Sequence, residues 1–158
     1  MKRLKLPQLI GAIFICQLAG IVGSIFTISA IPTWYAHLTK PAFSPPNWIF
    51  GPTWTILYTL MGIAIYLIWE KGTQKKSVKE AIWIFGLQLF LNFFWSVIFF
   101  GLKQPLLAFG EILFLWLAIG VTITKFYKLS KTAAYLLVPY ILWVSFAAVL
   151  NLKIVLLN

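Results

Sequence analysis

Long stretches without a charged side chain constrain this sequence more than any other feature. The hydrocarbon core of a bilayer is roughly 30 Å thick, and a helix crosses it with about 20 apolar residues. The apolar runs are continuous rather than alternating, which favours helices over the strands of a β-barrel. The charge-free stretches lie between Lys5 and Lys40, Lys40 and Glu70, Glu80 and Lys103, and Lys131 and Lys153.

A further apolar stretch, interrupted only by Glu111, provides a fifth span. Because 61% of the residues are hydrophobic and only 10% are charged, the chain cannot cover a water-soluble domain with polar surface. The composition also argues against a nucleic-acid partner. We therefore predict an all-α membrane protein with one domain, residues 1–158, folded as a single bundle of five transmembrane helices. The predicted helices span about 8–30, 49–69, 81–101, 106–124 and 133–155.

The first span follows a basic segment, as the apolar core of a signal peptide does. Its apolar stretch is longer than such a core, and no small-x-small cleavage site follows, so we interpret it as a helix. The single cysteine, Cys16, lies in it, which leaves no intrachain disulfide. Small residues recur there at every fourth position, and we interpret this stripe as packing within the bundle rather than as a dimer contact. The stripe is Ala12, Cys16, Gly20 and Ser24.

The basic residues divide unequally between the two sides of such a bundle. The positive-inside rule places the richer side in the cytoplasm, with the N-terminus, and leaves the first connection and the C-terminus outside. Each cluster lies directly beyond a span, so topology explains the net charge of +10 without an anionic ligand. The richer side has Lys2, Arg3, Lys5, Lys71, Lys75, Lys76, Lys79, Lys125, Lys128 and Lys131, and the other has Lys40, Lys103 and Lys153.

Polar and aromatic residues share helical faces inside three of the predicted spans. One interpretation is hydrogen bonding between helices, with the aromatic rings as filler. The other is a largely apolar pocket with a few oriented polar groups, suited to a flat aromatic ligand. The three faces are Gln88, Asn92 and Ser96 with Trp95 beside them; Trp54, Tyr58 and Gly62; and Tyr140, Trp143, Ala147 and Asn151.

The connection between the first two spans, residues 31–48, is long, aromatic and stiffened by four prolines. A plain connector is shorter, so we predict that this segment is a lid or a binding element. It contains the only histidine, His37, which could contact a ligand or a metal but is more simply an exposed loop residue. Glu111 is either a proton or cation site or a structural residue that bonds a neighbouring helix or reaches the outer interface.

Residues that perform conventional catalysis are missing. Three acids and one histidine provide no carboxylate pair, no catalytic triad and no metal-ligand set, so we expect no metal site and no classical enzyme activity.

Several motifs together resemble the tryptophan-rich sensory protein family (TspO/MBR), whose animal members are called the translocator protein or peripheral benzodiazepine receptor. The resemblance runs from about Trp34 to Asn151. Its first block is Trp34-Tyr35-Ala36, Lys40-Pro41, Pro45-Pro46-x-Trp48, Gly51-Pro52-x-Trp54, Leu57-Tyr58 and Met61-Gly62. The later blocks are Gln88-Leu89-x-Leu91-Asn92-x-x-Trp95 with Phe99-Phe100-Gly101, and Pro139-Tyr140-x-x-Trp143-x-x-Phe146-Ala147 with Leu150-Asn151.

The resemblance implies a five-helix membrane protein, usually a homodimer, that binds porphyrins such as protoporphyrin IX or haem and also benzodiazepine-type ligands. These are ligands in a pocket under the first loop, and no obligatory cofactor is implied. Some bacterial members are reported to degrade porphyrin in light, and Trp54 and Trp143 match the tryptophans implicated. The positions that match the family's binding residues are Tyr35, Pro45, Trp54, Tyr58, Asn92, Trp95, Trp143 and Ala147.

The sequence departs from the animal members at the end of the last span. Their cholesterol-recognition motif requires a Tyr before a basic residue, and residues 150–153 contain none, so the resemblance does not extend to sterol binding. A dimer seam of small residues around Gly86 is also not evident. The short tail ending at Asn158 and the lack of an organelle presequence favour a microbial plasma membrane. Three functions remain open: porphyrin sensing or regulation, light-dependent degradation, and transport.

Overall fold

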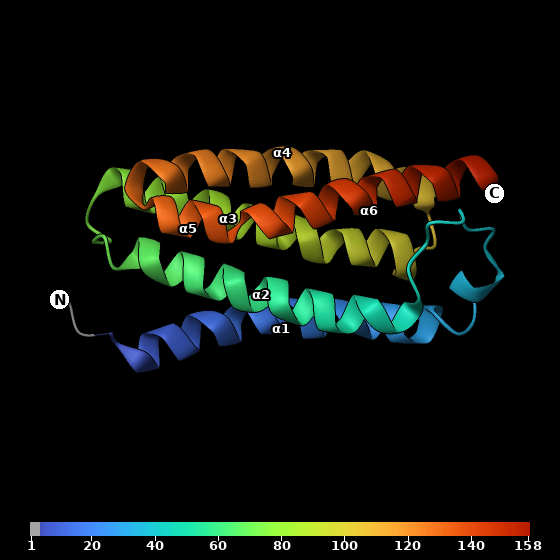
Figure 1. The fold of residues 1–158 in the computed structure, drawn as a ribbon, viewed down its shortest axis with the longest axis horizontal. Helices are drawn as coiled ribbons and strands as arrows, with labels where there is room; N and C mark the ends of the chain where they lie inside the picture. The colour runs from blue at the N-terminus through green and yellow to red at the C-terminus, as the bar shows by residue number, and fades with distance from the viewer. Residues whose placement is uncertain (1–3) are drawn as a thin grey trace.

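The computed structural model describes residues 4–158, which form a bundle of long helices (Figure 1). Five segments are long and apolar enough to cross a membrane, and no strand occurs in the described part of the chain, which confirms the predicted fold class. The elements are α1 (Leu6–Ala30), the 3₁₀ turn η1 (Tyr35–His37), α2 (Asn47–Trp69), α3 (Lys76–Ser96), the π-helical turn η2 (Val97–Gly101), α4 (Pro105–Leu129), α5 (Lys131–Leu136) and α6 (Val138–Leu157).

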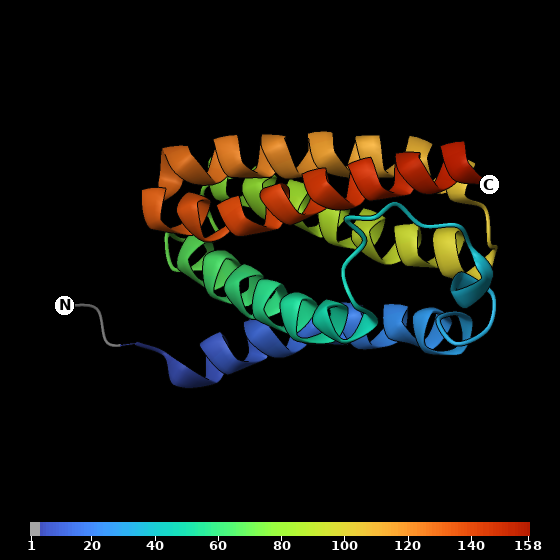
Figure 2. The same ribbon diagram turned by 45° about the vertical axis from the view of Figure 1, so that its right-hand side comes forward.

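The two ends of the bundle differ in chemistry. The connection between α1 and α2 lies at the same end as the C-terminus (Figure 2), and we name this the loop end. The start of α1, the α2–α3 connection and the α4–α5 junction lie at the opposite, basic end (Figure 1). All predicted members of the lysine-rich set from Lys5 onward belong to the basic end, whereas Lys2 and Arg3 lie outside the described residues.

At the basic end, two helices extend five residues beyond the predicted spans. The third helix begins at Lys76 rather than 81, and the fourth ends at Leu129 rather than 124. The predicted bounds stopped at charged residues, but a lysine does not end a helix. Its long side chain reaches water while its backbone stays hydrogen-bonded. At this end the helices are joined by an ion pair of 3.0 Å between Lys125 and Glu80.

The last span is divided, which corrects the prediction of one continuous helix over 133–155. The chain passes through a turn at Leu137 between α5 and α6. Pro139 lies two residues after Leu137, and because it lacks an N–H it cannot donate to the carbonyl of Tyr135 one turn earlier.

Small residues set how α1 crosses the bundle. A Cβ built on Gly62 would overlap the backbone of Ile13, and one built on Gly20 would overlap the ring of Tyr58, so α1 lies close against the middle of α2. Toward the loop end α1 leaves α2 and packs on α3 and η2, where Phe26 covers Gly101. Ala12 and Cys16 are buried, so this half of the small-residue stripe packs within the bundle as predicted.

Glu111 lies on the buried face of α4, with 9% of its surface exposed. Both carboxylate oxygens lack a hydrogen-bond partner within the described residues. Two predictions for Glu111 are therefore wrong. Within residues 4–158 its side chain does not hydrogen-bond to a neighbouring helix, and it does not extend to the outer interface. The other buried polar side chains, Gln88, Asn92, Thr122 and Asn151, are all hydrogen-bonded.

We predict that Gly62→Ala destabilises the protein by about 1–3 kcal/mol, because the new methyl group meets backbone that cannot rotate away. Thermal unfolding in detergent micelles measures the effect. The matched control is Gly86→Ala, since nothing lies within 4 Å of a Cβ at that position. The control should gain up to about 1 kcal/mol from helix propensity, and an equal gain at Gly62 would contradict the close contact.

We also predict that Glu111→Leu raises the unfolding temperature, because a buried polar group without a partner costs about 1–3 kcal/mol. The comparison variant is Glu111→Gln, which keeps the shape and a polar end and should give a smaller gain. A lower unfolding temperature for Glu111→Leu would mean that the carboxyl group binds an ion or water that supports the fold.

Candidate functional site: a cavity at the loop end

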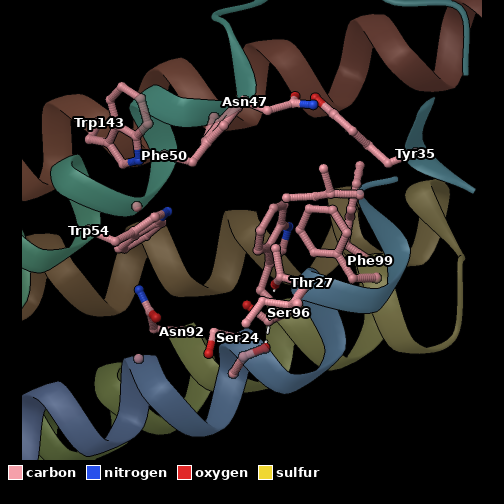
Figure 3. Close-up of a pocket in the computed structure, with 18 of the residues that line it drawn as sticks. Ser24, Thr27, Tyr35, Asn47, Phe50, Trp54, Asn92, Ser96, Phe99 and Trp143 are labelled. Carbon is pink, nitrogen blue, oxygen red and sulfur yellow. Dashed lines mark hydrogen bonds between the residues drawn. The ribbon is translucent and has the colours of Figure 1, made fainter. Parts of the chain in front are cut away.

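Between α1, α2, α3, η2 and α6 lies a cavity of about 490 Å³, within the range of roughly 300–1,000 Å³ typical of small-molecule sites. It occupies the space that opens where α1 leaves α2, and it extends to Tyr35 in the first loop (Figure 3). Seven of the eight predicted binding residues line it. They are Tyr35, Trp54, Tyr58, Asn92, Trp95, Trp143 and Ala147.

Pro45 is the predicted residue that the structure does not bring into the cavity. It is half-buried in the segment before α2, while Asn47 and Trp48, directly after the Pro45-Pro46 pair, do line the cavity. The two prolines cannot donate backbone hydrogen bonds, and α2 begins just beyond them, at Asn47.

The aromatic wall on α2 and α6 comes from residues one helical turn apart. Trp54 stacks on Tyr58 with ring centroids 5.5 Å apart and meets Tyr140 edge-on at 6.3 Å. Trp143 packs against Phe50 at 6.0 Å. Figure 3 shows Trp143, Phe50 and Trp54 on one side of the cavity and Ser24, Thr27 and Ser96 on the other.

Four tryptophans line the cavity. Trp48 is 75% exposed, and the other three differ in the state of their indole N–H. Trp95 donates to Oδ1 of Asn151 at 3.2 Å, and Asn151 in turn donates to the carbonyl of Pro105 at 2.8 Å. Trp54 and Trp143 have no hydrogen-bond acceptor for their N–H groups anywhere in residues 4–158. Trp95 therefore contributes a fixed ring face, while Trp54 and Trp143 also keep free donors.

The π-helical turn η2 shapes the wall beside Trp95. The N–H of Leu102 reaches back five residues to the carbonyl of Val97 at 2.8 Å, which widens the last turn of α3. Phe99 stacks on Trp95 with a centroid distance of 5.0 Å, and Phe100 meets it edge-on at 5.9 Å. Such turns interrupt a regular helix at a cost and are frequent at functional sites.

The first loop is held down at several points. Tyr35 is buried, with its ring 5.7 Å from Phe100, and burial raises its pKa above the ordinary value although a hydrogen bond with the Ser44 side chain acts in the opposite direction. Lys40 lies 4.7 Å above the Tyr35 ring and donates to the Tyr35 carbonyl at 2.8 Å. The Asn158 side chain pairs with both backbone groups of Thr39, at 2.9 Å each.

Residues 31–48 were predicted to be a lid or a binding element. Ile31, Tyr35, Asn47 and Trp48 of this segment line the cavity, which agrees with that prediction.

His37 is exposed, and its Nδ1 lies 2.5 Å from the carbonyl of Thr33 in the same turn. Glu111 does not line the cavity, and neither does His37. No group of three His, Cys, Asp or Glu side chains that could hold a metal occurs among residues 4–158.

The cavity wall carries no charge within the described residues. Its polar groups are amides, hydroxyls and indoles, and several hydroxyls are already bonded to their own helix. Ser24 donates to the carbonyl of Ile21 at 2.6 Å, and Thr55 donates to that of Gly51 at 2.9 Å. A wall of this kind fits a flat, mostly apolar molecule with few polar edges.

Sequence reasoning missed the contribution of α1. Gly20, Gly23, Ser24 and Thr27 line the cavity, but small residues at helical spacing are also the signature of helix packing. Gly20 serves both purposes, because it contacts Tyr58 and borders the cavity. The spacing alone cannot separate the two roles.

Comparison with known proteins identifies the family. Residues 12–157 match the TspO/MBR family. The chain is 45% identical over 155 residues to the tryptophan-rich protein TspO of Archaeoglobus fulgidus, covering 98% of this chain and 99% of the relative. It is 39% identical over 137 residues to the human translocator protein, covering 85% and 80%, and 34% identical over 125 residues to the tryptophan-rich sensory protein of Cereibacter sphaeroides, covering 79% and 77%. The chain therefore belongs to the TspO/MBR family of integral membrane proteins.

Proposed function

We propose that this protein binds tetrapyrroles such as protoporphyrin IX or haem in the loop-end cavity and thereby senses, regulates or transports porphyrin. The observation that carries the proposal is the pair of cavity tryptophans, Trp54 and Trp143, whose indole N–H groups are free in an uncharged aromatic cavity of about 490 Å³. Aromatic faces attract a flat ring system through stacking and area burial. Free N–H donors attract acceptor groups on its edge.

The names of the relatives agree with this proposal at a general level. Translocator and sensory protein describe movement and detection of a ligand, and they are names of the relatives only. We extend the proposal to a homodimer in a microbial plasma membrane, with the loop end outside and the basic end in the cytoplasm.

Light-dependent oxidative degradation of porphyrin is the second candidate. It is favoured by the same two indoles, because tryptophan is readily oxidised and both rings border the cavity that would hold the photoexcited ligand. The two candidates differ in what happens after binding, so one experiment separates them.

The test is a titration of the purified protein in lipid nanodiscs with protoporphyrin IX, followed by absorbance in darkness and under illumination. Binding predicts a saturable spectral shift in darkness. Degradation predicts, in addition, light-dependent bleaching with a defined product at a rate above that of free porphyrin. No saturable shift in darkness would contradict both.

We predict that Trp54→Phe and Trp143→Phe still bind porphyrin but lose up to about tenfold in affinity, because the phenyl ring still stacks while the N–H donor is gone. If the protein degrades porphyrin, both variants should bind it yet lose the light-dependent product. Trp83→Phe is the control, because Trp83 is exposed on α3 away from the cavity. Full binding and full photochemistry in both cavity variants would place the ligand elsewhere.

We further predict that a cysteine introduced in the α2–α3 connection is cytoplasmic and that one introduced within residues 31–46 is external. The basic end carries most of the lysines, and positive charge is retained on the cytoplasmic side. Accessibility of introduced cysteines to a membrane-impermeant reagent in intact cells measures this. Labelling of the α2–α3 connection from outside would contradict the proposed orientation.

A further inference from the structure

Four polar side chains from three helices form one buried hydrogen-bonded chain that begins at the cavity. Tyr58 of α2 and Asn92 of α3 line the cavity, whereas Tyr140 of α6 and Gln88 of α3 lie behind them. The chain runs Tyr58, Asn92, Tyr140, Gln88, and each of these side chains is at least nine-tenths buried.

The chain has a direction because each hydroxyl has one proton. Tyr140 donates its proton to Oε1 of Gln88 at 2.8 Å, so its oxygen is free to accept from Nδ2 of Asn92, also at 2.8 Å. This turns Oδ1 of Asn92 toward Tyr58, which donates to it. The only hydroxyl proton of Tyr58 is therefore engaged by Asn92, and a ligand group that reaches the Tyr58 oxygen from the cavity meets lone pairs alone.

A second neighbour decides this direction. With both amides turned over, the same four groups could bond in reverse, and Tyr58 would then direct its proton into the cavity. In the observed direction Nε2 of Gln88 lies 3.9 Å from Sδ of Met61, which is itself fully buried. Sulfur accepts weakly and donates nothing, so the reversed amide would place a carbonyl oxygen against it without a bond.

Asn92 does not discriminate between ligands in the same way. In either direction it retains one free N–H and one free oxygen lone pair, so it can meet a donor or an acceptor. Only the Tyr58 oxygen changes character with the direction of the chain.

We propose that Tyr58 is a fixed hydrogen-bond acceptor in the cavity and that Gln88 and Met61, which do not line it, are the positioning residues that set this polarity. The cavity then selects flat aromatic ligands with an N–H or O–H donor on the edge that reaches Tyr58. The opposite chemistry, an acceptor, suits the free N–H groups of Trp54 and Trp143. The inference rests on the proposed function in that it concerns the same cavity.

The test uses carbazole and dibenzofuran, planar tricycles of nearly the same shape that differ by an N–H donor or an oxygen acceptor. Dissociation constants of both are measured for the wild type and for Tyr58→Phe in nanodiscs by tryptophan fluorescence. The ratio of the two constants, compared between wild type and variant, cancels differences in partition into lipid. We expect the wild type to favour carbazole about three- to tenfold more than Tyr58→Phe does.

Gln88→Met tests the positioning role, since methionine has a similar length and no strong acceptor. Tyr140 then has only Asn92 to donate to, the chain reverses, and the preference should shift toward dibenzofuran. A merely structural role of Gln88 would weaken both tricycles alike and leave their ratio unchanged. Gln8→Met makes the same change on the exposed start of α1 and is the control. If Gln88→Met does not fold, Met61→Leu replaces it, since leucine has a similar volume and no sulfur. Neither direction of the chain is then favoured, and the preference should come close to that of Tyr58→Phe.

Equal ratios in wild type and Tyr58→Phe would overturn the acceptor, and an unchanged ratio in Gln88→Met, or in Met61→Leu where that variant replaces it, would overturn the positioning role. A wild type that binds neither tricycle also contradicts the inference. Protoporphyrin IX titrated into the same samples keeps the proposals separate. If porphyrin binds but the ratio of the two dissociation constants is the same in wild type and Tyr58→Phe, only this inference is refuted. If the ratio differs but porphyrin does not bind, only porphyrin binding is refuted.

Discussion

The close approach of α1 to α2 is the contact on which the cavity depends. Gly62 lets the α1 backbone touch α2 at Ile13, and about two turns further along α1, Gly20 receives the ring of Tyr58. Beyond this point α1 packs on η2 through Phe26 and Gly101. The middle of α1 contacts α2, whereas its loop end packs on α3 and η2. A space therefore remains between the loop ends of α1 and α2, and this space is the cavity. Interhelical packing thus creates the site.

The second constraint is that polar groups in a bilayer need partners inside the protein. Around the cavity this requirement is met by amides and hydroxyls without any charge. Each of these hydrogen bonds also fixes the orientation of a side chain, as the bond to Asn151 does for the Trp95 indole. On the cavity wall, the N–H groups of Trp54 and Trp143 have no partner within the described residues, and away from the cavity the same holds for both oxygens of Glu111. The pattern of satisfied and free groups on the wall therefore describes the chemistry that the cavity can accept.

The sequence predicted the helices because charges are costly in lipid, and this cost leaves a visible pattern. It did not predict helix ends at Lys76 and Leu129, since lysines tolerate both the interface and the helix. The division of the last span depends on one backbone donor missing at Pro139. Seven cavity residues were predicted from helical spacing or family motifs, whereas the α1 residues were not, because packing and lining use the same small side chains.

Gln88 illustrates what spacing can and cannot provide. Its position four residues before Asn92 places both on one face of α3, and the sequence offered hydrogen bonding between helices and a ligand pocket as alternatives. The structure shows that these are not exclusive. Asn92 bonds to α2 and α6 and also borders the cavity, while Gln88 ends the chain against Met61. The direction of that chain depends on the positions of five side chains from three helices, Met61 included, and no one-dimensional pattern contains it. A buried network of this kind links the identity of residues outside a cavity to the hydrogen-bonding character of its wall.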